Sequence, residues 1–151
     1  MSYLIKPYYI RNLLSRKLEQ HNTETGMLDI TVFHEEFKEP LPNALIKVYK
    51  ISVSGEYNEN GAGTLVHQSL TPNNGYLQRL ELPVLNELMP GNRDFYFIAI
   101  HHPTHHSAYI FNVEIYPNII TSFNVYLNFR YTNEEFFKFN LNPRRSEIIS
   151  H

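Results

Sequence analysis

Alternation of apolar and polar residues with a period of two is the feature that most constrains the fold of this chain. It runs from Met27 to Phe129 in short segments, which are separated by turns rich in Gly, Pro and Asn. Successive side chains of a strand point to opposite faces of a sheet, so this pattern is typical of strands with one face in a core. No helical segments lie between these strands, which favours an antiparallel sandwich over a parallel α/β sheet.

The phase of the alternation predicts which side chains face the core. The predicted inward faces are Leu28, Ile30 and Val32; Ala44, Ile46 and Val48; Tyr96, Ile98 and Ile100; Tyr109, Phe111, Val113 and Ile115; and Phe123, Val125, Leu127 and Phe129. The opposite faces also carry aromatic residues, namely Phe33, Tyr49, Phe95, Phe97, Tyr116 and Tyr126. Because water normally selects polar residues on an open face, we expect the N-terminal segment, the C-terminal tail or another subunit to cover them.

The chain is predicted to be all-β: a seven-stranded antiparallel β-sandwich, immunoglobulin-like or transthyretin-like, with an N-terminal amphipathic helix. The helix is indicated by "YYIRNLLSRKLEQH", residues 8–21, whose apolar residues follow helical spacing. It either covers one end of the sandwich or docks on a partner chain. We place the helical extension at residues 1–25, the sandwich at 26–129 and a tail at 130–151. In the tail, "EEFFKF" predicts a short helix or an extra edge strand.

Composition and charge narrow the classes of function. Thirteen Lys and Arg against fifteen Asp and Glu give a net charge of −2, which offers no electrostatic surface for nucleic acid. Cysteine is absent, so disulfides and thiolate sites are excluded. No segment approaches the roughly 20 apolar residues of a membrane span, and the N-terminus does not resemble a signal peptide. We therefore expect the protein to be made in the cytoplasm and not to cross a membrane by itself.

Four sequence segments in order resemble a carboxypeptidase regulatory-like domain, which is a transthyretin-related β-sandwich. They are "GMLDITVF", "PLPNALIKVYK", "TPNNGYLQRLELP" and "FNVEIYPNIITSFNVYLNF". The form with "LELP" followed by "FNVEIYP" is similar to copies found in spore-forming Gram-positive bacteria. The chain departs from the family pattern at Pro72, where Asp is usual, and before Tyr109, where Gly is usual. The resemblance implies a structural or adhesive role, in a spore or cell-envelope assembly, and implies no catalytic residues.

Half of the chain's eight histidines lie in one stretch, "HHPTHH", which falls on a predicted connection between two strands. They are His101, His102, His105 and His106. Imidazole nitrogens bind zinc, copper or nickel when two to four rings converge. Neighbours on a strand point to opposite faces, so a turn at Pro103-Thr104 would bring either His102 to His105 or His101 to His106.

A third ligand for a divalent metal would have to come from elsewhere in the chain. His34 or His67 would supply it only if the fold brought one of them close. The alternative interpretation is a solvated loop whose histidines bond to backbone or water. Four clustered rings would repel one another once protonated, so this loop is expected to loosen in mild acid.

The sequence contains no recognisable catalytic constellation. The acidic pairs Glu35-Glu36 and Glu134-Glu135 are adjacent, so their side chains diverge on a strand. There is no Gly-x-Ser-x-Gly motif, and "GAG" at residues 61–63 lacks the rest of a phosphate loop. The C-terminal "RSEIISH" also lacks the Tyr-Arg-Gly-Ser ending of transthyretin-related hydrolases.

We therefore predict a non-catalytic structural or protein-interaction module without a cofactor, which binds a protein partner or a second copy of itself. The alternative is a small ligand-binding module, which would take a divalent metal through the histidine stretch or carbohydrate on its aromatic rings.

Overall fold

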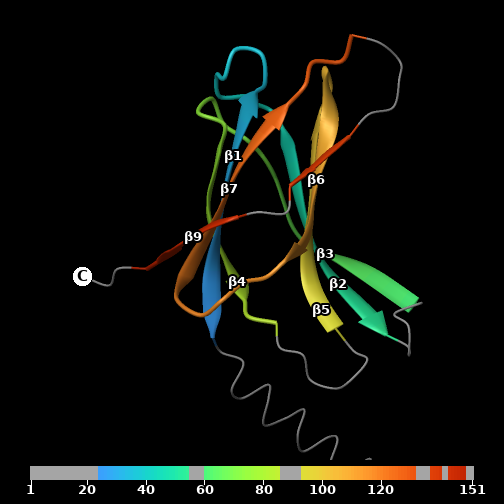
Figure 1. The fold of residues 1–151 in the computed structure, drawn as a ribbon, viewed down its shortest axis with the longest axis vertical. Coiled ribbons are helices and arrows are strands. Elements are labelled where there is room, and N and C mark those ends of the chain that lie inside the picture. Colours follow the sequence, from blue (N-terminus) through green and yellow to red (C-terminus); the bar gives the residue numbers. More distant parts are fainter. Residues whose placement is uncertain (1–23, 55–59, 86–92, 132–136, 141–142, 149–151) are drawn as a thin grey trace, which may run out of the picture.

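Two packed β-sheets form the part of the chain that the structure describes (Figure 1). The structure is a computed structural model that describes residues 24–54, 60–85, 93–131, 137–140 and 143–148. Its strands are β1 (Thr25–His34), β2 (Leu45–Ser54), β3 (Asn60–Leu70), β4 (Tyr76–Pro83), β5 (Arg93–His102), β6 (His105–Val113), β7 (Ile119–Leu127), β8 (Lys138–Asn140) and β9 (Arg144–Glu147). These residues contain no helix, and the predicted all-β sandwich is confirmed.

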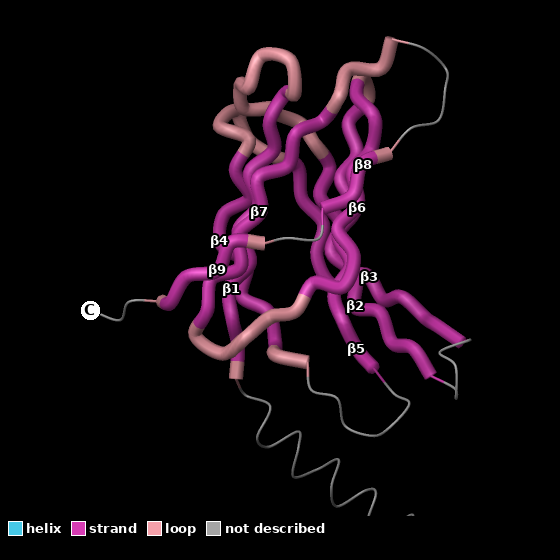
Figure 2. Tube along the Cα trace, viewed as in Figure 1, coloured by secondary structure: helices cyan, strands magenta, loops and turns pink. Residues whose placement is uncertain are grey.

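The strands divide between sheet I, with the order β4-β1-β7-β9, and sheet II, with the order β3-β2-β5-β6-β8 (Figure 2). Most neighbours are antiparallel, but β7 lies parallel to β1 and β8 lies parallel to β6. The predicted antiparallel arrangement of the seven strands is therefore wrong for β1 and β7, while β8 lies in the predicted tail. The chain leaves sheet II after β6 and enters sheet I beside β1, which places β7 in the same direction as β1.

The core lies between the two sheets and follows the predicted alternation in β1, β2, β5 and β7. The buried residues of these strands include Leu28, Ile30, Val32, Ile46, Val48, Tyr96, Ile98, Ile100, Phe123, Val125 and Leu127. Ala44, just before β2, is also fully buried. Burying one such large aliphatic side chain stabilises the fold by roughly 1.5–3 kcal/mol, so this shared interior holds the sheets together.

The predicted inward face of β6 is wrong in its first half. Ala108 and Ile110 are buried there, whereas Tyr109 and Phe111 lie on the outer face. At Asn112 the backbone takes a φ of 54°, and the pairing with β5 shifts register at the same place. This irregularity changes the phase, so that Val113 returns to the core.

The end of β7 brings a second correction. Phe129, which was predicted to face the core, lies beyond the last residue of β7 and is 36% exposed. The strict alternation stops with the strand at Leu127.

Two short strands extend the sheets beyond the seven that the sequence predicts. Both lie in the predicted tail: β8 pairs with β6 at the edge of sheet II, and β9 pairs with β7 at the edge of sheet I. The predicted helix over residues 8–21 and the pair Glu134-Glu135 lie outside the described residues. Among the residues described, the structure has no helix of the length and apolarity needed to span a membrane.

The turn between β3 and β4 fixes how sheet II connects to sheet I. Gly75 has a φ of +68°, as the "TPNNG" turn predicts, and a Cβ there would lie 2.4 Å from the Val32 carbonyl oxygen. The Val32 N–H donates to the Gly75 carbonyl oxygen at 2.8 Å. The turn is thereby tied to the central part of β1.

Candidate functional site

The histidine stretch forms the tight turn between β5 and β6. His102 is the last residue of β5 and His105 the first of β6, and their Cα atoms are register partners. Of the two pairings that the sequence allowed, the structure therefore contains the one between His102 and His105. His101 instead points to the outer face of sheet II, where its Nδ1 lies 2.7 Å from the Ser107 hydroxyl oxygen. The backbone N–H of His106 donates to the Asn128 carbonyl oxygen at 2.8 Å.

A third histidine reaches this turn from the other sheet. The ring of His34, at the end of β1, packs edge-on against His105 with centroids 4.7 Å apart. His102 contacts the same ring at 4.7 Å, and their Nδ1 atoms are 3.1 Å apart. We call His34, His102 and His105 the histidine cluster. His67, the other candidate third ring, lies in β3 with its Nε2 3.1 Å from the Ser69 hydroxyl oxygen.

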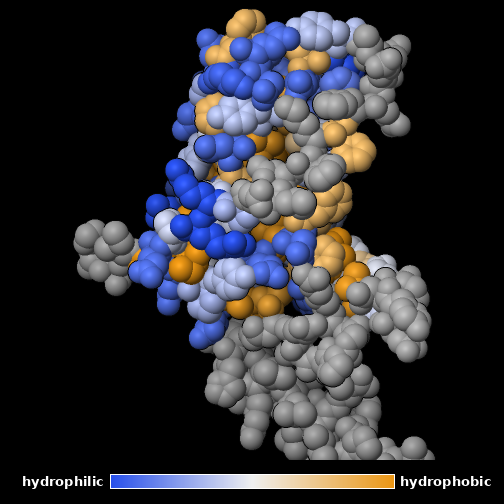
Figure 3. All heavy atoms as spheres, in the orientation of Figure 1, coloured by the Kyte–Doolittle hydropathy of each residue, from blue (hydrophilic) through white to orange (hydrophobic). Residues whose placement is uncertain are grey.

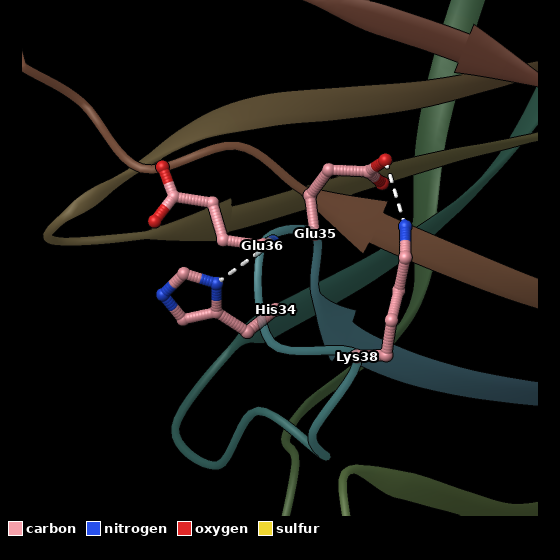
Figure 4. Close-up of polar contacts among 4 residues, drawn as sticks. All are labelled: His34, Glu35, Glu36 and Lys38. Atoms are coloured by element: carbon pink, nitrogen blue, oxygen red, sulfur yellow. Dashed lines mark hydrogen bonds and ion pairs between the residues drawn. The ribbon is translucent and has the colours of Figure 1, made fainter.

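Hydrogen bonds from the backbone orient two rings of the histidine cluster. The Nδ1 of His34 accepts from the Glu36 N–H at 3.3 Å, in the turn that also holds the Glu35–Lys38 ion pair at 2.9 Å (Figure 4). The Nδ1 of His102 accepts from the Thr104 N–H at 3.2 Å. Both rings therefore carry a lone pair on Nδ1 and are neutral in this arrangement.

Burial makes His105 a weak base. Its ring is 2% exposed, and its Nε2 has no hydrogen-bond partner in the described part of the chain. Burial, together with the neighbouring rings of His102 and His34, lowers the pKa of His105 to about 4. Burial also lowers the pKa of His102, although a hydrogen bond to the Pro42 carbonyl oxygen opposes this effect. His102 and His105 are accordingly neutral at neutral pH.

The geometry offers two metal ligands at most from the turn. Two nitrogens that bind one tetrahedral zinc at about 2.0–2.1 Å lie roughly 3.3 Å apart, which is close to the separation of the His102 and His105 Nδ1 atoms. Among the residues described, however, no three His, Asp or Glu side chains are placed to hold a metal ion together. The predicted metal site at His101, His102, His105 and His106 stays a prediction, and His101 points away from the other nitrogens.

A groove at the other end of the sandwich also contains ionisable groups. It has a volume of about 310 Å³, and its lining includes Asp94, Tyr96, Glu114 and Tyr116. The Tyr96 hydroxyl donates to the Pro83 carbonyl oxygen at 2.7 Å, and burial raises the pKa of Tyr96 to about 12. The Tyr116 hydroxyl donates to the Glu114 carboxylate. Both hydroxyls are held in structural hydrogen bonds, and among the described residues no histidine lines the groove to act as a base.

The outer face of sheet II carries a connected set of aromatic rings. We call Tyr49, Phe97, Tyr109, Phe111 and Phe137 the aromatic face. Phe97 lies at its centre, with ring centroids 6.0 Å from Tyr49, 5.9 Å from Tyr109 and 5.1 Å from Phe111. Phe137, just before β8, packs on Tyr109 at 5.5 Å. Hydrophobic residues gather along the side of the molecule where β5 and β6 lie (Figure 3).

Much of the aromatic face is open to water. Phe111 is 42% exposed and Phe137 is 55% exposed, and Leu65 of β3, the register partner of Tyr49, is 47% exposed. The sequence identified Tyr49 and Phe97 as outward-facing but assigned Tyr109 and Phe111 to the core. Apolar Ala108 and Ile110 stand in the opposite phase of the same strand, and this was the signal that could have corrected the assignment.

The outer face of sheet I has fewer aromatic residues and carries charged side chains. Phe33 stacks on Tyr126 at 5.0 Å, and the Lys38 ammonium lies 4.7 Å above the Tyr126 ring. Arg79 pairs with Asp29 across β4 and β1 at 3.7 Å. Sheet II therefore presents the more apolar of the two outer surfaces.

Comparison with known proteins adds little to this geometry. No family model matches the sequence, and no curated protein matches it significantly. The fold is similar to a structure of catechol 1,2-dioxygenase from Acinetobacter sp. ADP1 inhibited by bound mercury, with a TM-score of 0.46 and 13% sequence identity. The match covers 77% of this chain and 59% of that one. A likeness at this level does not bear on the activity of the present chain.

Proposed function

We propose that this chain is a non-catalytic structural or protein-interaction module that works by self-association. The observation that carries the proposal is the aromatic face, in which Tyr49, Phe97 and Tyr109 connect to the exposed rings of Phe111 and Phe137. The resemblance to carboxypeptidase regulatory-like domains supports a transthyretin-like sandwich and a setting in a bacterial spore or cell-envelope assembly.

Covering this face contributes favourable free energy to association. A large aromatic side chain buries about 150–250 Å², so the exposed parts of Phe111 and Phe137 each leave roughly 60–140 Å² in water. At about 25 cal/mol per Å², covering either ring stabilises a complex by roughly 2 kcal/mol. Leu65 and the partly exposed rings of Tyr49, Phe97 and Tyr109 add to this surface.

The chemistry of the described residues also favours a binding role over catalysis. The buried ring of His105 is too weak a base to take a proton at neutral pH. Tyr96 and Tyr116 hold structural hydrogen bonds, and the groove beside them lacks a histidine. The described residues thus place no activated nucleophile beside a base.

A charge introduced into the aromatic face tests the proposal. We expect the natural protein to have a mass above that of the monomer in size-exclusion chromatography with light scattering at about 100 μM. Phe111→Lys should raise the dissociation constant of self-association at least tenfold, because covering position 111 would then require the charged lysine to lose its water. Phe37→Lys is the matched control, since Phe37 is 66% exposed in the turn after β1 and lies outside the aromatic face.

The proposal fails if the natural protein stays monomeric up to millimolar concentration. It also fails if Phe111→Lys associates as tightly as the natural protein. Far-UV circular dichroism on both variants establishes that the sandwich is intact.

A further inference from the structure

Strand β3 forms an outer edge of sheet II. It runs for 11 residues, from Asn60 to Leu70, and in the described part of the chain it pairs only with β2 (Figures 1 and 2). Among the described residues no strand pairs with the backbone N–H and C=O groups on its far side, and these are the groups to which another strand would bond.

The four edge strands of the two sheets differ in the features that prevent pairing with another chain. Charged side chains and proline on an edge strand oppose the addition of a further strand. The edge strand β4 carries Arg79 and Glu81, β9 carries three charged residues in four positions, and β8 has only three residues, one of them Lys138. By contrast, β3 contains no charged residue and no proline along its whole length.

Apolar side chains accompany this uncharged edge. Leu65, Val66 and Leu70 are 47%, 43% and 59% exposed, respectively. Leu65 is also the register partner of Tyr49, so the aromatic face of sheet II continues to the edge at β3. A strand added here would cover the backbone groups and these side chains together.

We propose that the outer edge of β3 pairs with β3 of a second copy of this chain, so that sheet II continues from one protomer into the next. The inference rests on the self-association proposed above and adds a contact at the sheet edge to the one at the aromatic face, because pairing at β3 leaves Phe111 of β6 uncovered. Identical edges pair antiparallel around a two-fold axis. Since β3 is uncharged throughout, such pairing places no like charges opposite each other, whereas a charged strand of another protein would find no ion-pair partner there.

The joined sheet would also enlarge the apolar surface. An 11-residue antiparallel strand is about 37 Å long, and pairing along it forms roughly one hydrogen bond per residue. The aromatic faces of two protomers would then lie on the same side of one continuous sheet, connected through the two copies of Leu65.

A charge at Val66 is the first test. Val66 lies at the irregularity where β2 has no residue directly opposite, so Val66→Lys adds a charge to the edge without facing Lys47 or Lys50. We expect Val66→Lys to raise the dissociation constant at least tenfold, as measured by light scattering. Val66→Thr, which keeps the shape without a charge, should associate within threefold of the natural protein. Gln78→Lys, an exposed position at the irregularity in β4, controls for charge added to any edge.

Mixing oppositely charged variants identifies the partner as a second copy. Val66→Lys and Val66→Glu should each associate at least tenfold more weakly than the natural protein, and an equimolar mixture should recover association, because opposite charges then lie close together in the paired strands. If both single variants are weakened and their mixture associates no more tightly than either alone, pairing between copies of β3 is overturned.

Hydrogen exchange separates this inference from the proposed function. Pairing at the edge should slow exchange of β3 amides at least tenfold when the protein is concentrated from about 1 to 200 μM. If the protein associates while these amides exchange at the same rate, and Val66→Lys associates like the natural protein, β3 pairing is overturned and the proposed function stands. A natural protein that is monomeric at every concentration overturns both.

Discussion

At the scale of single residues, His105 couples the folded state to pH. The unfolded chain binds a proton at this ring near the ordinary pKa of 6.5, whereas burial lowers the pKa in the folded state to about 4. Between these values the unfolded state binds more protons, so the free energy of unfolding falls as the pH falls. A tenfold change in proton affinity is worth about 1.4 kcal/mol, so the full loss from this ring is roughly 3 kcal/mol.

The measurement is the urea midpoint between pH 7.5 and 4. We expect the natural protein to lose most of the roughly 3 kcal/mol that comes from His105 below pH 6.5. The free energy of unfolding of His105→Asn should fall by about 3 kcal/mol less over the same interval, because no ring titrates at position 105. If the free energy of unfolding falls equally with pH in the two proteins, His105 is protonated in the folded state without cost.

The sequence pattern predicted the histidine cluster only in part. A turn at Pro103-Thr104 allows two pairings, and the choice of His102 with His105 follows from the register of β5 on β6. The position of His34 depends on how sheet I packs on sheet II, which local alternation does not encode. The low pKa of His105 depends on the same long-range packing, and the sequence shows only an ordinary histidine.

At the scale of elements, periodicity predicts strands well when their inward faces are continuous. In β1, β2, β5 and β7 the buried residues include all those that the alternation assigned to the inward face, except Phe129 beyond the end of β7. In β6 both phases are apolar, since Ala108 and Ile110 alternate with Tyr109 and Phe111. The backbone irregularity at Asn112, which the sequence does not reveal, decides between them.

Of the two short strands, β9 escaped prediction, and the sequence left β8 open between a short helix and an extra edge strand, for a different reason. β8 and β9 have three and four residues, too few for alternation to be recognised. β9 carries exposed side chains throughout, so its place in sheet I comes from backbone pairing with β7. Strands of this kind are specified by the edge that they join, and their own side chains contribute little.

The turn before β4 gives a prediction at this scale. Gly75→Ala should lower the free energy of unfolding by about 2 kcal/mol or more, because alanine is strained at a φ of +68° and its Cβ would meet the Val32 carbonyl oxygen. Chemical denaturation followed by circular dichroism measures the change. Gly61→Ala is the control, since its Cβ would lie 3.5 Å from the Val53 side chain, an ordinary contact. If Gly61→Ala lowered the free energy of unfolding as much, then an added Cβ would be unfavourable at glycines in general, and the positive φ of Gly75 would not explain its effect.

At the scale of the whole molecule, the sequence predicted two packed layers but not how the strands divide between them. The parallel pairing of β1 with β7 joins residues that are about a hundred positions apart, such as Met27 with Ile120. No local pattern carries that information, because an alternating strand fits either sheet equally well. The partition is set by which arrangement buries all the inward faces in one interior.

That single interior gives the last prediction. Every residue of the core cluster lies between Leu28 and Leu127, and the contacts of Phe129 and Arg130 with the β5–β6 turn end by residue 131. We therefore expect a fragment of residues 24–131 to fold, with one cooperative urea transition seen equally by circular dichroism and tyrosine fluorescence. Loss of β8 and β9 should cost a few kcal/mol at most, since the four side chains of β9 are exposed and the two strands together contribute seven residues. An unfolded fragment would mean that these edge strands, or residues 1–23, supply stability that the shared interior lacks.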